Sequence, residues 1–243
     1  MRIFADYHTH TVYSHGKGTI EENVVVAIKK GLEAIGITDH GPANIGIGMD
    51  LKDFDKMKKE IDFLRRKYDN IEIKLGVEAN VIGVDGQLDV PLKILKSLDI
   101  VLVGLHPFVK PASFRDGIDL FFKNQLAKHL ELFNKSSRTT NTRALVNAIK
   151  RNPIDVITHP GLKLSIDTRE LAKAAAEYNV ALEINSGHRH LTEDYIRIAL
   201  EEGANFLISS DAHSPEDVGD VEWGKKLVEK MGIPVCRIIN ART

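Results

Sequence analysis

Residues 1–10 read MRIFADYHTH, a short apolar run that ends in two histidines separated by one residue. On an extended strand, His8 and His10 point to the same face, so both rings could bind one metal ion. The same spacing recurs near the other end of the chain, at Asp211 and His213 in SSDAHS (residues 209–214). Both segments therefore have the form of a buried strand that ends in a pair of metal-binding side chains.

Runs rich in Ile, Val and Leu alternate with longer amphipathic stretches, which is the pattern of βα units around a parallel sheet. Thr19 and Glu22 have the spacing of a capping box at the start of the first helix. We predict an α/β fold, a seven-stranded and somewhat irregular (β/α) barrel, with an open doubly wound sheet as the alternative. The predicted strands are residues 2–7, 34–38, 71–77, 99–104, 154–158, 180–184 and 205–209.

The composition fits one domain over residues 1–243, because 43% hydrophobic content can fill one large barrel core. Lysine plus arginine (33) nearly balances aspartate plus glutamate (34), so the overall charge favours neither nucleic acid nor an anionic membrane as a partner. Cys236 is the only cysteine, which excludes a thiolate zinc site. With no apolar run long enough for a signal peptide or a membrane span, we expect a cytoplasmic protein.

About fifty residues separate the fourth and fifth predicted strands, which is long for a barrel connection. We predict one helix over residues 114–133 and a second over residues 141–150. Asn141 is interpreted as a helix cap rather than a substrate contact. Residues 111–140 could form a lid over the site, and a purely structural helical hairpin is the alternative.

The positions of the histidines carry most of the functional information. Only His129 is predicted to lie within a helix. The other nine fall at or just beyond the ends of predicted strands, and in parallel α/β folds these ends converge on the rim where ligands bind. These nine are His8, His10, His15, His40, His106, His159, His188, His190 and His213.

Glu78, in GVEAN at the end of the third strand, would be costly to bury without a cation, so we interpret it as a carboxylate that bridges two metals. Each group has a simpler interpretation when it is taken alone. His106 and His159, each before a proline, could be hydrogen-bonded loop residues. Asp39 could orient a neighbouring ligand or cap a strand end. Packing alone does not explain why so many strand ends carry such groups.

Six segments resemble, in order and spacing, the motifs of the PHP (polymerase and histidinol phosphatase) superfamily, particularly its stand-alone YcdX-like phosphatases. The resemblance extends from Asp6 to about Ser214. The matching segments are DYHTHTVYSH (6–15), ITDHGP (37–42), GVEAN (76–80), GLHP (104–107), THPG (158–161) and SSDAHS (209–214).

The resemblance implies a distorted (β/α)7 barrel, a TIM-like architecture, that binds three divalent metal ions. Zinc is the first expectation, with manganese or iron as alternatives. The ligand sets implied by the family are His8, His10, Glu78 and Asp211 for one ion, His15, His40 and His213 for a second, and Glu78, His106 and His159 for the third.

Such a trinuclear site suits hydrolysis of a small phosphorylated substrate, in which a hydroxide held between metals attacks phosphorus in line. A metal-bound water, or a residue such as His190 or Asp39, could protonate the leaving group. Arg189, in NSGHRH (residues 185–190), could clamp the phosphate through two hydrogen bonds. Lys163 and Ser165 have weaker claims to a role in the site.

Other functions remain open from sequence alone. A histidinol-phosphate phosphatase belongs to the same superfamily, and related PHP domains act as nucleases or phosphodiesterases. A non-catalytic metal-binding module would need a cluster without an open coordination position. An amidohydrolase also begins with the HxH pattern, but the Asp211–His213 pair, Glu78 and the lack of an evident bridging lysine favour PHP.

Overall fold

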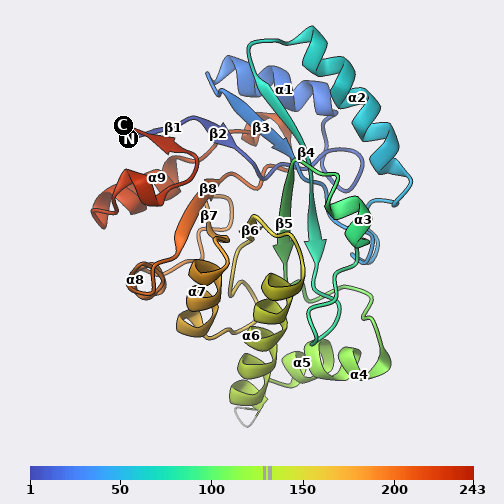
Figure 1. The fold of residues 1–243 in the computed structure, drawn as a ribbon, viewed down its shortest axis with the longest axis vertical. Helices are drawn as coiled ribbons and strands as arrows, with labels where there is room; N and C mark the ends of the chain where they lie inside the picture. Colours follow the sequence, from blue (N-terminus) through green and yellow to red (C-terminus); the bar gives the residue numbers. More distant parts are fainter. Residues whose placement is uncertain (128–129, 131–132) are drawn as a thin grey trace.

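The fold was analysed in a computed structural model, which describes residues 1–127, 130 and 133–243. Seven strands form one parallel sheet in sequence order, from β2 to β8 (Figure 1). The edges of this sheet meet at a parallel bridge between Thr9 and Ala212, where the amide of His10 donates to the carbonyl of Ala212 at 2.8 Å. The strands are β2 (Ala5–Asp6), β3 (Ala34–Ile37), β4 (Glu72–Asn80), β5 (Ile100–Gly104), β6 (Val156–Ile157), β7 (Ala181–Asn185) and β8 (Asn205–Ser209).

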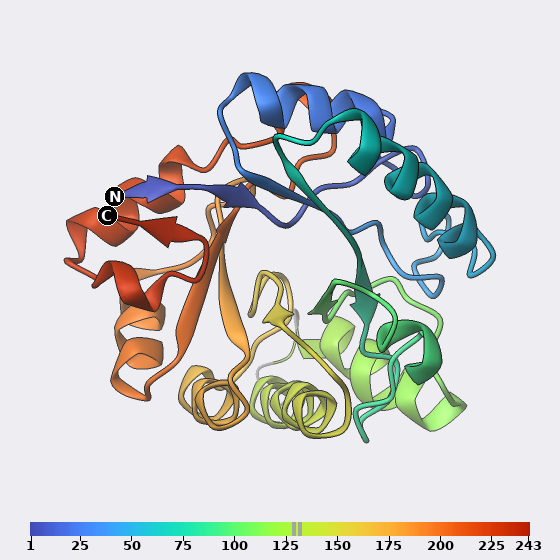
Figure 2. The ribbon, with the colours of Figure 1, turned by 45° about the horizontal axis from the view of Figure 1, so that its top comes forward.

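The result is a nearly closed barrel with helices around its outside (Figure 2), so the predicted seven-stranded barrel is confirmed. Thr19 and Glu22 form the predicted capping box. None of the described helices is both long and apolar enough to cross a membrane. The helices outside the long insertion are α1 (Ile20–Lys29), α2 (Asp53–Lys67), α3 (Leu92–Leu95), α6 (Asn134–Arg151), α7 (Thr168–Glu177), α8 (Glu193–Glu201) and α9 (Glu222–Lys230), with 3-10 turns η3 (Pro215–Asp217) and η4 (Val235–Arg237).

The core has two layers because successive side chains of a strand point to opposite faces. In β5, Val101 and Val103 join the large cluster between strands and helices, whereas Leu102 joins a smaller cluster inside the barrel. That inner cluster includes Ala5 and Ala181, whose small side chains suit a narrow interior. Glu78 is the register partner of Leu102 on the neighbouring strand. The inner apolar layer therefore lies directly against the side chains of the candidate site.

The first predicted strand, residues 2–7, is divided between two sheets in the structure. β1 (Arg2–Ile3) pairs antiparallel with β9 (Ala241–Arg242), and only β2 joins the barrel. The prediction of one continuous strand was wrong, and β9 was not predicted. The physical reason is length, because two-residue strands carry no periodicity that a sequence pattern can reveal.

The insertion differs from its prediction in its helices. Its described part forms α4 (Phe114–Asp116), the π-helix η1 (Gly117–Phe122) and α5 (Lys123–Ala127), while His129 lies outside the described residues. The following helix, α6, begins at Asn134 rather than near residue 141, so the prediction of Asn141 as a cap was wrong.

Side-chain contacts explain why α6 starts early. Thr139 and Thr142 donate their hydroxyl groups to carbonyls four residues earlier, at 3.0 and 2.7 Å, which satisfies these polar side chains within the helix. Asn141 is fully buried and exchanges two amide hydrogen bonds, of 2.8 and 2.9 Å, with Asn124. Tertiary contacts thus override the turn-like composition of this segment.

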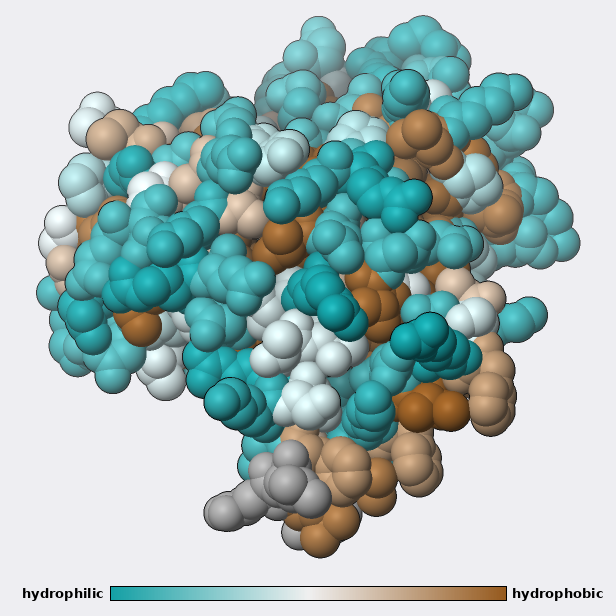
Figure 3. Space-filling model, turned by 60° about the horizontal axis from the view of Figure 1, so that its bottom comes forward, coloured by the Kyte–Doolittle hydropathy of each residue, from teal (hydrophilic) through white to brown (hydrophobic). Residues whose placement is uncertain are grey.

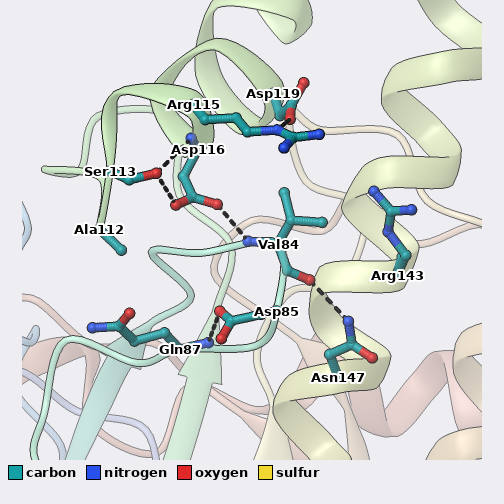
Figure 4. A pocket seen from close by; sticks show the side chains of 10 residues that line it. All are labelled: Val84, Asp85, Gln87, Ala112, Ser113, Arg115, Asp116, Asp119, Arg143 and Asn147. Atoms are coloured by element: carbon teal, nitrogen blue, oxygen red, sulfur yellow. Dashed lines mark hydrogen bonds and ion pairs between the residues drawn. The ribbon is translucent and has the colours of Figure 1, made fainter.

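The insertion packs against the loop after β4 and against α6, around the shallow pocket in Figure 4. Asp116 accepts the backbone N–H of Val84 at 2.9 Å, and the Asn147 side chain donates to the Val84 carbonyl at 2.9 Å. Phe114 is 86% exposed, and apolar side chains lie at the lower edge of the face in Figure 3. The described residues of 111–140 do not line the histidine cavity, and the lid stays a prediction.

Candidate metal centre

The predicted metal-binding side chains meet at the C-terminal rim of the barrel. Most of them belong to the loops that directly follow the strands, and Glu78 lies within β4 itself. His8, His10 and Glu78 are fully buried. A cavity of about 530 Å³ opens above them, lined by six of the histidines and by Asp211. The barrel therefore collects donors from six separate chain segments into one space.

One group of donors joins the first and last strand ends. His8 Nε2 and His10 Nε2 lie 3.1 Å apart and are 3.4 and 3.1 Å from Asp211 Oδ1. Glu78 Oε2 lies 3.5 Å from His8 Nε2. His8, His10 and Asp211 thus surround one small volume with the spacing that a divalent ion requires, and Glu78 lies beside them.

The other oxygen of Glu78 faces a second group. Glu78 Oε1 lies 2.8 Å from His159 Nε2 and 3.4 Å from His106 Nε2, and the two ring nitrogens are 3.3 Å apart. Glu78 thus faces the ring nitrogens of both groups with one carboxylate, the position expected of a bridge.

A third group lies beside the first. The ligand atoms of His10, His40 and His213 lie within 4.8 Å of one another. The ring of His15 is 4.2 Å from that of His213 and 4.9 Å from that of His40. Partial burial and the charges of His213 and His40 lower the pKa of His15 to about 4, so its ring is neutral at pH 7 and able to act as a ligand.

Hydrogen bonds from the outer ring nitrogens orient these imidazoles. His8 Nδ1 lies 2.5 Å from Glu183 Oε1, His106 Nδ1 lies 2.7 Å from Asn80 Oδ1, and His213 Nδ1 lies 2.8 Å from the Asp211 carbonyl. Because each Nδ1 carries a proton and donates it in a hydrogen bond to one of these acceptors, Nε2 is left facing the cluster. This is the usual arrangement around metal-bound histidine.

Glu183 and Asn80 were not identified from the sequence. Glu183 lies in the middle of β7, fully buried, and accepts from Ser209 Oγ at 2.6 Å and from the His159 backbone N–H at 2.6 Å. Burial by itself raises the pKa of this carboxyl, but the imidazoles of His8 and His159 lower it below its usual value. An acidic residue inside an apolar run (ALEIN, residues 181–185) was the available signal.

The donor set fits divalent cations. Glu78 Oε2, His40 Nδ1 and His10 Nδ1 are buried without a hydrogen-bond partner, although Glu78 Oε2 and His40 Nδ1 are only 2.6 Å apart. Buried polar atoms without partners are rare and costly. Gly104 also makes room for the group, because a Cβ there would lie 2.5 Å from His106 Cε1 and 3.1 Å from Glu78 Oε1.

Asp39 is buried beside this cluster, and its carboxylate faces the loop after β2. It accepts from the hydroxyl groups of Thr11 and Ser14, at 2.7 and 2.5 Å, and from their backbone amides. These contacts hold the turn that presents His15. A role for Asp39 in leaving-group protonation stays a prediction, since the carboxylate is already engaged with the loop.

After the sixth barrel strand, the residue that reaches the cavity is His188, not the predicted Arg189 or His190. Arg189 is exposed and donates through Nε to the Ser186 carbonyl, and His190 Nε2 lies 3.3 Å from the Pro160 carbonyl in a neighbouring pocket. His188 lines the metal cavity instead, with Nε2 3.3 Å from Asp211 Oδ2. The Asn185 side chain fixes this turn by accepting the His188 backbone N–H at 2.8 Å.

Of the two residues with weaker claims, Lys163 lines the cavity, whereas Ser165 lies in the neighbouring pocket. Lys163 also has a left-handed backbone, with φ of 62°, as do Asp211 at 57° and His159 at 28°. Such conformations cost roughly 1–3 kcal/mol for residues other than glycine and persist where surrounding structure holds them. The rim is thus held in a backbone geometry that local preference disfavours.

Known proteins resemble this chain in sequence and in fold. The PHP domain family model matches residues 6–187. A protein of Caldanaerobacter subterraneus subsp. tengcongensis named as a probable phosphatase is 36% identical over 99% of this chain and 88% of its own length. Another from Tolumonas auensis with the same name is 33% identical over 99% of this chain and 90% of its own length.

Among solved structures, the histidinol phosphate phosphatase of Lactococcus lactis, complexed with zinc, L-histidinol and phosphate, superposes with a TM-score of 0.65. It is 17% identical, and the match covers 96% of this chain and 95% of that one. This likeness concerns the fold. Together with the family model and the closely matched relatives, it shows that the chain belongs to the PHP domain family and is a metal-dependent phosphatase.

Proposed function

We propose that this protein hydrolyses small phosphate monoesters at a trinuclear centre on the barrel rim. The observation that carries the proposal is Glu78, a fully buried carboxylate with one oxygen 3.5 Å from His8 Nε2 and the other 2.8 Å from His159 Nε2. Burial raises the pKa of this carboxyl, but the surrounding imidazoles, His106 and His8 foremost, hold it well below its usual range. Glu78 is therefore ionised, as a bridging ligand must be.

We assign the ligands as the family resemblance implies. His8, His10 and Asp211 would hold one ion, His15, His40 and His213 a second, and His106 and His159 the third, with Glu78 between the first and third. Divalent ions bound there would lower the pKa of a coordinated water and neutralise charge on the attacking and leaving oxygens. Imidazole and carboxylate donors suit zinc, manganese or iron, with zinc preferred.

The remaining side chains at the cavity mouth handle the substrate. His188 Nε2 is 3.3 Å from Asp211 Oδ2 on one side and its side chain is 41% exposed, so the ring can reach a bound ester. We assign His188, rather than His190, to donate a proton to the leaving oxygen.

The alternative functions have less support. A nuclease needs a basic groove, whereas this chain has a net charge of −1 and a compact cavity. A non-catalytic module would close its metal cluster, but here a cavity of about 530 Å³ reaches the ligands. A histidinol-phosphate phosphatase remains a narrower form of the same activity, and the Lactococcus lactis neighbour is the reason to include its substrate in the assay.

The test uses protein purified without added metal. Elemental analysis should find close to three divalent ions per chain after reconstitution, and release of phosphate from phenyl phosphate should require them. Bis(4-nitrophenyl) phosphate, a labelled oligonucleotide and histidinol phosphate should be turned over more slowly. Faster cleavage of the diester or the oligonucleotide would contradict the monoesterase, and no hydrolysis of any ester by the fully loaded protein would support a binding module.

A further inference from the structure

The charged side chains of the cavity that are not candidate metal ligands are both positive. Lys17 and Lys163 line it from the loops after β2 and β6, and Asp211, itself a candidate ligand, is the only carboxylate among the described lining residues. Neither lysine forms an ion pair within the described part of the chain. Both lysines are exposed side chains at the cavity, so their ammonium groups can reach a substrate that enters it.

Both lysines are attached to the segments that carry candidate ligands. The backbone amide of Lys17 donates to the carbonyl of His213 at 2.8 Å. Lys163 follows His159 by four residues, in a turn closed by the amide of Leu162 donating to the His159 carbonyl at 3.0 Å. The left-handed backbone of Lys163, with φ of 62°, is a conformation that surrounding contacts must hold. Their positions are thus tied to the metal centre rather than to a free surface loop.

Besides these two positive charges, the cavity mouth has an apolar wall. Phe108 and Ile47 line the cavity and are 71% and 37% exposed. Their loops are joined by an antiparallel bridge between Asn44 and Val109, and the amide of Lys110 donates to the Ala43 carbonyl at 2.9 Å. Exposed apolar side chains held in place at a cavity mouth are typical of a ligand contact.

We infer that the preferred substrate is a phosphate monoester whose alcohol part is an apolar ring or chain bearing a second anionic group. This inference rests on the proposed phosphatase function. Phe108 and Ile47 would contact the apolar part, and Lys17 and Lys163 would bind the second anion, a carboxylate or another phosphate. An amino-alcohol ester would bring its ammonium group against the two lysines with no free carboxylate to receive it. Lys17 and Lys163 are therefore specificity-determining residues.

The experiment compares four esters that share one ring: phenyl phosphate, 4-carboxyphenyl phosphate, 1,4-phenylene bisphosphate and 4-(aminomethyl)phenyl phosphate. The kcat/KM of each is measured for the metal-loaded wild type, Lys17→Met, Lys163→Met and the double variant. Lys93→Met, at an exposed position on α3, is the matched control. Ratios are compared between variants, because differences in leaving-group reactivity then cancel.

The wild type should favour the anionic esters over the ammonium ester, and each lysine variant should reduce that ratio about fivefold, as expected for one partly exposed ion pair. The double variant should reduce it more, and Lys93→Met should not change it. Comparison of 4-carboxyphenyl phosphate with 1,4-phenylene bisphosphate shows whether the second anion is a carboxylate or a phosphate. A ratio within about twofold of wild type in the double variant would overturn the inference.

This assay distinguishes failure of the substrate class from failure of the phosphatase function. If the wild type hydrolyses phenyl phosphate but the lysine variants keep the wild-type ratio, the substrate class is wrong and the phosphatase stands. If the loaded wild type hydrolyses none of the four esters, the proposed function is wrong and this inference falls with it. Phe108→Ala should raise the KM for phenyl phosphate more than that for ethyl phosphate, whereas Phe63→Ala, an exposed phenylalanine on α2, should change neither.

Discussion

Glu183 Oε1 lies 2.5 Å from His8 Nδ1, while the other oxygen of the same carboxylate accepts the backbone N–H of His159 at 2.6 Å. Two candidate ligands, one from each of the groups that Glu78 faces, are therefore held by one buried side chain. Because His8 donates from Nδ1, its Nε2 faces the cluster, and its tautomer is set by Glu183. Glu183 would therefore position two candidate ligands without binding a metal ion itself.

Replacing Glu183 with glutamine should weaken metal binding about 10- to 100-fold, because the amide keeps the shape but loses the charge that fixes the His8 ring. Affinity can be measured by competition with a chelating dye. Glu177→Gln, at an exposed position on α7, is the matched control. Unchanged affinity in Glu183→Gln, with a native circular dichroism spectrum, would show that the contact does not position His8.

Glu78→Gln should keep the fold and lower phosphate-ester hydrolysis at least about 100-fold, since a neutral amide cannot bridge two cations. Elemental analysis should show loss of metal along with the loss of turnover. Glu72→Gln, on the same strand with its side chain 61% exposed, should behave like the wild type. Full metal occupancy and normal turnover in Glu78→Gln would remove this residue from the centre.

Metal binding at pH 7 should release at least one proton. Burial by itself lowers the pKa of His8, but Asp211, Glu183 and Glu78 raise it well above its usual value, and the pKa of His159 is raised as well. In the metal-free protein His8 is therefore protonated, and a metal ion must displace that proton. Affinity should rise with pH until the raised pKa is passed.

Calorimetric titrations in buffers of different ionisation enthalpy count the protons released. Glu183→Gln should lower this number at pH 7, because it removes one of the charges that raise the pKa of His8. Binding enthalpies that are independent of the buffer would contradict the protonated state of His8.

Removing the metals should loosen the closure of the barrel. His8 and His10 follow β2, and Asp211 and His213 follow β8, so ions held by these residues link the two edges beside the Thr9–Ala212 bridge. With metal present at about a thousand times its Kd, binding adds ~4 kcal/mol of stability. A chelator should then lower the Tm by about 8–16 °C for a chain of this size.

Hydrogen exchange locates the change within the fold. The amides of His10 and Ala212, which bond across the closure, should exchange faster in the chelated protein, whereas that of Leu102 in the middle of the sheet should not. Equal protection of His10 with and without metal would show that the barrel closes independently of the ions.

The sequence predicted the barrel well where strands were long enough to show a pattern. The run at residues 99–104 became β5 (Ile100–Gly104), since five buried apolar residues have few alternatives to a strand in a parallel sheet. β1 and β9 pair over only two residues each, so their pairing depends on chain ends that meet in space. No local sequence pattern indicates that these two strands pair.

The candidate ligands could be predicted from the sequence, because their spacing is a local pattern. The residues that orient these ligands could not. His8 and His10 share a face because of their spacing, but Glu183 reaches His8 only through the register of β7 against the rest of the barrel. In the loop after β7, His188 and His190 both follow the strand end, and the sequence does not distinguish them. The Asn185 turn decides which one faces the cavity.

The left-handed backbone at Asp211, His159 and Lys163 bears on how this protein can change over evolution or in the laboratory. At each of these positions glycine would relax the main chain, so selection for stability alone favours losing two candidate metal ligands and one cavity lysine. Stabilised variants drawn from a random library should therefore include inactive ones altered at the rim. Directed improvement of this enzyme is best confined to the helices and the outer core, where stability and activity do not compete.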